Sequence, residues 1–72
     1  MIINIYWSNQ FRNNPIYMSF QVKMGCALIE KYGNVEINDL KTDESICYYE
    51  INGTRIELSD DHIWSIFKTG KL

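Results

Sequence analysis

Two short runs of β-forming residues flank Asn52-Gly53 and give the clearest pattern in the chain. An Asn-Gly pair favours a two-residue type I′ turn, because both of its central positions need a positive φ. We therefore predict a hairpin formed by residues 45–51 and 54–59. Its register pairs Ile51 with Thr54, Tyr49 with Ile56 and Cys47 with Leu58 on an apolar face, and Glu50 with Arg55 and Tyr48 with Glu57 on a polar face.

A helix is predicted directly after this hairpin. Ser59 is a good N-cap residue, and two aspartates follow it where the helix dipole favours negative charge. Gly70 can take the left-handed position that ends a helix. The apolar side that would pack on the sheet consists of Ile63, Ile66 and Phe67.

The first half of the chain is more ambiguous. Residues 2–7 form a plausible strand, and residues 16–24 alternate between apolar and polar side chains, which also predicts a strand. The competing interpretation is a helix from Ser19 to Tyr32 that ends at Gly33. We prefer the strand, because Gly25 inside a helix would cost about 1 kcal/mol.

The remaining segments are assigned more loosely. Residues 26–32 are left open between a strand and a short helix, and Val35 and Ile37 could begin a brief edge strand. Residues 8–14 and 39–44 are predicted to be polar loops. Together these elements predict one domain over residues 1–72, of the α+β class, with a small antiparallel sheet of about four to five strands and a C-terminal helix packed on one face.

The chain holds ten aromatic residues, which is many for a core of this size. Some of these rings should therefore lie on the surface, where tyrosine and tryptophan are effective contact residues in protein interfaces. The candidate anchors for a protein partner are Trp7, Phe11, Tyr17, Tyr48 and Trp64.

Charge is distributed unevenly around a net value of −2. Residues 1–33 carry three basic side chains and one acidic one, whereas residues 34–72 carry four basic and eight acidic side chains. Without a basic stripe, direct binding to nucleic acid is not expected. The acidic half could instead orient a basic protein surface, and the candidate acidic contacts are Glu36, Asp39, Asp43 and Glu44.

No pattern indicates catalysis or a bound metal. Cys26 and Cys47 form no Cys-x-x-Cys motif, and His62 is the only histidine. We expect no catalytic residue, no cofactor and no metal ligand. Because the sequence shows neither a signal peptide nor a membrane span, we expect a cytoplasmic protein that does not bind membranes.

Ile, Asn, Lys and Tyr supply 28 of the 72 residues, a bias typical of AT-rich genomes. Small non-enzymatic proteins from such genomes are often products of phages or mobile elements. The preferred hypothesis is a protein-binding inhibitor or regulator that occludes a functional surface of a host protein, for example a nuclease or an immune effector. The alternative is a small structural or self-assembling protein, either a homodimer or a subunit of a larger complex.

Overall fold

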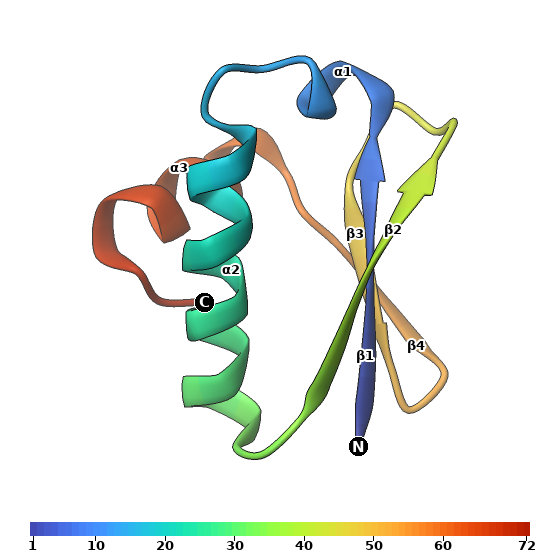
Figure 1. The fold of residues 1–72 in the computed structure, drawn as a ribbon, viewed down its shortest axis with the longest axis vertical. Coiled ribbons are helices and arrows are strands. Elements are labelled where there is room, and N and C mark those ends of the chain that lie inside the picture. Colours follow the sequence, from blue (N-terminus) through green and yellow to red (C-terminus); the bar gives the residue numbers. More distant parts are fainter.

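Two helices cover one side of a four-stranded sheet and leave its other side bare (Figure 1). The computed structural model describes residues 1–72. Its elements in chain order are β1 (Ile2–Ser8), α1 (Asn9–Arg12), α2 (Tyr17–Tyr32), β2 (Glu36–Thr42), β3 (Tyr48–Ile51), β4 (Thr54–Glu57) and α3 (Asp60–Thr69).

The strands lie in the order β2-β1-β3-β4. β1 pairs with β2 in parallel and with β3 in antiparallel orientation, and β3 pairs with β4 in antiparallel orientation. The predicted α+β class is confirmed, with four strands and a C-terminal helix. The sheet is mixed rather than wholly antiparallel, because α2 carries the chain back across the sheet between β1 and β2.

The hairpin has the predicted register. Tyr49 pairs with Ile56 and Ile51 pairs with Thr54. Asn52 has a φ of 52° and Gly53 a φ of 77°, as a type I′ turn requires. The predicted Cys47–Leu58 pair is present as a backbone hydrogen bond of 2.9 Å beyond the end of β4.

The C-terminal helix also begins and ends where the sequence predicts. The Ser59 hydroxyl accepts a hydrogen bond from the backbone N–H of His62, and Gly70 ends the helix with a φ of 69°. Ile66 is fully buried, and Ile63 and Phe67 pack against the core from the same side of α3. A helix of ten residues persists because this side is buried against the rest of the protein.

The predicted strand over residues 16–24 was wrong, since these residues lie mainly in α2, and the segment left open, 26–32, continues the same helix. Phe20, Met24, Ala27 and Leu28 are buried at helical spacing. The alternation that suggested a strand arises because apolar side chains occupy both the inner and the outer side of α2. The stabilisation from burying the inner side outweighs the cost of Gly25.

The predicted loop over residues 8–14 was wrong for residues 9–12, which form the short helix α1, and the predicted loop over residues 39–44 was wrong for residues 39–42, which extend β2. All seven residues of β2 pair with β1. The polar side chains do not prevent this, because β2 is an edge strand with little of its surface buried. The Asn38 side-chain amide donates to the side-chain Oδ1 of Asn4 over 3.0 Å and links the two strands on the bare side of the sheet.

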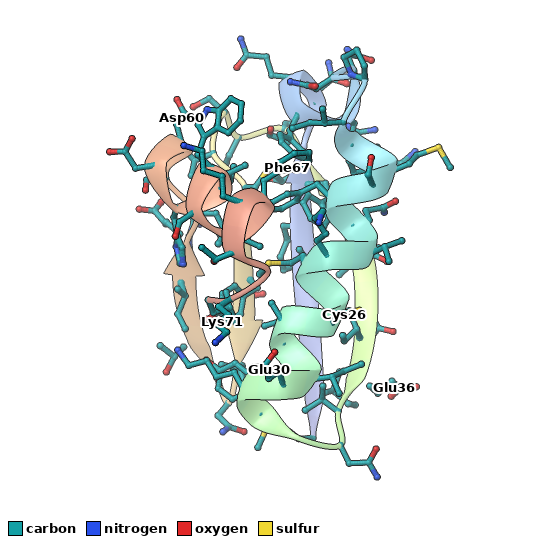
Figure 2. The ribbon with its side chains drawn as sticks, turned by 90° about the vertical axis from the view of Figure 1, so that its left-hand side faces the viewer. Cys26, Glu30, Glu36, Asp60, Phe67 and Lys71 are labelled. Carbon is teal, nitrogen blue, oxygen red and sulfur yellow. The ribbon has the colours of Figure 1, made fainter.

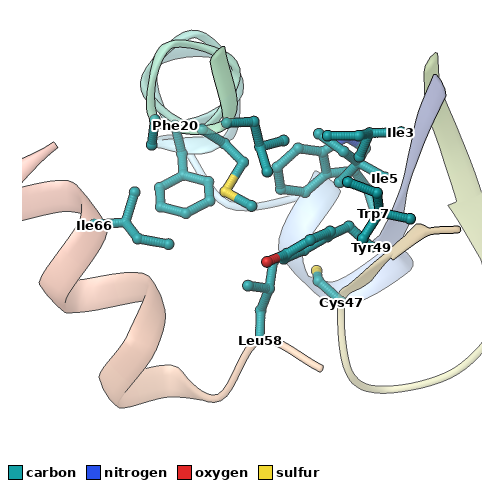
Figure 3. Packing of buried hydrophobic residues seen from close by; sticks show 12 residues of the cluster. Ile3, Ile5, Trp7, Phe20, Cys47, Tyr49, Leu58 and Ile66 are labelled. Atoms are coloured by element: carbon teal, nitrogen blue, oxygen red, sulfur yellow. The ribbon is translucent and has the colours of Figure 1, made fainter. Parts of the chain in front are cut away.

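The core lies between the sheet and the two longer helices (Figure 3). β1 contributes three fully buried side chains, from Ile3, Ile5 and Trp7. Tyr49 from β3 lies in the same layer, and its hydroxyl is 3.2 Å from that of Tyr32. Burial and this contact raise the pKa of Tyr49. Burial of these side chains fixes the C-terminal end of β1. The short helix α1 and the loop before α2 follow directly from this end.

Candidate functional site

The largest concave surface lies at the C-terminal end of β1. We call it the apical groove and define it by two adjoining cavities of about 470 and 180 Å³. They share four lining residues, so the surface is continuous. The full lining is Ser8, Gln10, Phe11, Asn14, Ile16, Ser45, Ile46, Cys47, Leu58, Ser59, Asp60, Ile63, Trp64 and Phe67.

Three segments position the walls of the groove. Ser8 ends β1 and caps α1 by accepting from the backbone N–H of Phe11 over 3.2 Å. This short helix places the Phe11 ring 5.6 Å from the Trp7 ring, so that Phe11 rests on the core while lining the groove. The first two turns of α3 form the opposite wall, and Asp60 and Phe67 can be followed along this helix in Figure 2.

Two large apolar side chains are exposed at opposite ends of the groove. Trp64 is 58% exposed in the smaller cavity, and Ile46 is 43% exposed in the larger one. The Trp64 ring is held edge-on at 6.1 Å from the Phe67 ring. A tryptophan side chain supplies a large contact area with few rotatable bonds, and tryptophan is enriched among binding hot spots.

The lining of the groove carries one charged side chain, the carboxylate of Asp60, and the ammonium Nζ of Lys23 lies 5.5 Å from the centroid of the Phe67 ring. Asp60 lines both cavities, and no lysine, arginine or histidine lines either. Asp61 follows in the first turn of α3, and Asp43 lies in the loop that contributes Ser45 and Ile46. The other polar groups of the lining are hydroxyls and amides. The surface therefore matches an apolar side chain accompanied by a positive charge.

The predicted anchors occupy different environments. Trp7 is fully buried, so its prediction as a surface contact is corrected: it is a core residue, with its indole N–H bonded to Asp39. Phe11 and Tyr17 are half-buried with their rings 6.0 Å apart, and burial raises the pKa of Tyr17. Of the five predicted anchors, only Phe11 and Trp64 line the groove.

The predicted acidic contacts do not form one cluster. Glu36 begins β2, next to Met1 and far along the strand from the groove. Asp39 accepts from Trp7, so it has a structural role. Asp43 and Glu44 lie in the loop after β2, on the same side of the molecule as the groove. Sequence reasoning missed the contribution of Asp60, which it assigned only to the helix dipole.

The bare side of the sheet carries Tyr48, a further predicted anchor. The Tyr48 ring stacks on the Tyr6 ring at a centroid distance of 4.6 Å, and the Arg55 guanidinium lies 3.7 Å from its centroid. Arg55 donates to both carboxylate oxygens of Glu44, over 2.8 and 3.0 Å, and to Glu57 over 3.1 Å. The predicted cross-strand attraction to Glu50 is thus replaced by these two pairs.

The ion pairs of Arg55 neutralise acidic side chains on the bare side of the sheet. Hydrogen bonding from Arg55 lowers the pKa of Glu44, and hydrogen bonding to Glu50 raises the pKa of Tyr6. On this surface Arg55 therefore neutralises Glu44 and covers the ring of Tyr48.

The two cysteines differ in their surroundings. Cys47 is buried, accepts from the backbone N–H of Ser8 over 3.2 Å and lies 3.4 Å from the Ser8 hydroxyl. Cys26 is exposed on α2. No group of three or more histidine, cysteine, aspartate or glutamate side chains is arranged to hold a metal ion.

Comparison with protein-family models, curated proteins and solved structures finds no match. None of the helices combines the length and the apolar character needed to cross a lipid bilayer.

Proposed function

We propose that this chain is a non-enzymatic regulator or inhibitor that binds another protein through the apical groove and so blocks a functional surface of that protein. The observation that carries the proposal is the exposed, oriented ring of Trp64 beside a groove that contains Asp60 and no basic side chain. Interfaces of this kind derive most of their binding energy from a few aromatic anchors.

The occupant that fits is a segment with an apolar side chain next to lysine or arginine. Its apolar part would cover Trp64 and Phe11, and its charge would lie beside Asp60. Charge complementarity of this kind mainly increases the association rate and selects among partners. The sequence predicted an acidic surface that orients a basic partner. We propose that this surface is the rim of the apical groove.

Affinity capture from the native host, followed by mass spectrometry, tests the proposal. We expect one protein to be retained by the wild type and lost with Trp64→Ala, since truncation of such an anchor costs about 2 kcal/mol or more, or roughly 30-fold in affinity. Ile2→Ala is the matched control, because Ile2 is 54% exposed but lies at the start of β1. Equal retention by all three proteins would refute the proposed site.

A separate substitution tests the contribution of charge in the groove to binding. Asp60→Lys should reduce the association rate of the captured partner and weaken its dependence on salt. Asp61→Lys provides a comparison with the same net charge, because Asp61 lies outside the lining of the groove. If both substitutions reduce the rate equally, the effect comes from the overall charge of the chain and not from a charge in the groove.

A further inference from the structure

The outer side of α2 carries an apolar stripe that nothing in the chain covers. Met18 is 76% exposed, Val22 is 68% exposed and Ile29 is 52% exposed, and Cys26 is exposed among them. At about 100° per residue, these four side chains project from one side of the helix, opposite the side that carries Phe20 and Met24. Figure 2 shows α2 in front of the sheet, with Cys26 and Glu30 along it.

An ordinary surface helix places polar residues where α2 places this stripe. A helix that is apolar on both sides is usually buried on both. The stripe shares no residue with the apical groove, so it is a second surface and needs its own occupant.

We infer that the occupant is a second copy of this chain, packed through α2 against α2 in antiparallel orientation around a two-fold axis. In this arrangement the two ends of the stripe lie opposite each other. If the axis passes at the level of residues 23 and 24, Met18 lies level with Ile29 of the second copy. Val22 then lies level with Gly25 of the second copy.

The helix dipole of α2 also favours the antiparallel orientation. The first turn of α2 contains no acidic residue, and its N-cap residue Ile16 provides no side-chain hydrogen bond, so the positive end of this helix dipole is uncompensated. Antiparallel packing places the C-terminal turn of the second copy's α2, the negative end of its dipole, beside this end. Glu30 and Lys31 in that turn carry opposite charges, so the dipoles and not a net charge favour this orientation. A parallel pair would instead place the two uncompensated N-termini together.

The small area buried between two helices limits the affinity of the dimer. A single pair of helices buries less than the roughly 800 Å² per partner of a standard interface, so we expect a reversible dimer with a dissociation constant in the micromolar range or weaker. Such a dimer would present two apical grooves and would allow bivalent binding.

Sedimentation equilibrium on the purified full chain tests the inference. The wild type should dimerise as concentration rises from micromolar toward millimolar, and Val22→Glu should weaken dimerisation by at least tenfold. Glutamate is a better helix former than valine, so the variant should retain the fold, which far-UV circular dichroism checks. Ser65→Glu, an exposed position on α3, is the matched control and should dimerise as the wild type does.

Cys26 provides an independent readout. In the inferred arrangement the two Cys26 sites are offset by about 8 Å along the helix axes, within reach of a flexible bis-maleimide. Because Cys47 is buried, covalent dimers should form through Cys26 and disappear with Cys26→Ser and with Val22→Glu. A wild type that stays monomeric, or a dimer that Val22→Glu leaves intact, would overturn the inference without affecting the groove.

Discussion

The indole N–H of Trp7 donates to the Asp39 carboxylate over 2.9 Å and so joins the centre of the sheet to its edge strand. Trp7 is fully buried, so loss of this acceptor would leave a donor without a partner. Replacing Asp39 with leucine should lower the free energy of unfolding by about 1–3 kcal/mol. Urea titration measures this loss. Asp39→Asn retains an acceptor and should cost clearly less; an equal cost for both variants would show that the bond is unimportant.

Gly25 and Gly33 should respond in opposite directions to alanine. A methyl group at Gly25 would meet its nearest neighbour, the Ile37 side chain, at 3.9 Å, which is an ordinary contact. Gly25→Ala should therefore stabilise the protein by about 0.5–1 kcal/mol through helix propensity. Gly33 has a φ of 83°, so alanine there should destabilise by about 1–3 kcal/mol. Thermal or urea unfolding of both variants checks the signs.

Alkaline stability should depend on Tyr49. Burial and the Tyr32 hydroxyl raise its pKa, so the folded state retains the phenolic proton more firmly than the unfolded state does. The resulting stabilisation is complete below the unfolded pKa of about 10 and decreases as the pH rises above it. Urea titrations at increasing pH should show a shallower loss of stability for Tyr49→Phe than for the wild type. Parallel curves for the two proteins would contradict this assignment.

Acid stability should include a small contribution from Glu44. Hydrogen bonding from Arg55 lowers the pKa of this carboxylate, so its contribution is present at neutral pH and is lost as the pH falls through the folded-state pKa. Glu44→Gln should flatten the pH dependence of unfolding below about pH 5. Asp43→Asn is the control, a neighbouring acidic residue outside the Arg55 ion pairs, and the two variants should differ.

Local rules predicted the second half of the fold. The Asn52-Gly53 turn, the cross-strand register and the cap at Ser59 each depend on residues close together in the sequence, and all three are present. The first half depends on contacts between distant residues. The extension of β2 to Thr42 follows from parallel pairing with β1, a relationship that no local pattern encodes.

The helix α2 shows why periodicity failed. Met18 and Val22 face outward while Phe20 and Met24 face inward, so two apolar sides of one helix resemble a strand in the sequence. For the site, Phe11 and Trp64 are the two predicted anchors that line the groove. Composition could not show that Trp7 is buried, nor that Ile46 from another loop lies on the same surface as Trp64.

Contact between Trp64 in the apical groove and a protein partner is the central feature of the proposed function. The two tryptophans provide an internal comparison in a ¹H–¹⁵N spectrum of the chain with and without the captured protein. The indole signal of exposed Trp64 should shift or broaden on binding, while that of buried Trp7 should stay in place. An unchanged Trp64 signal, with perturbations confined to the outer side of α2 or to the bare side of the sheet, would contradict the proposed function.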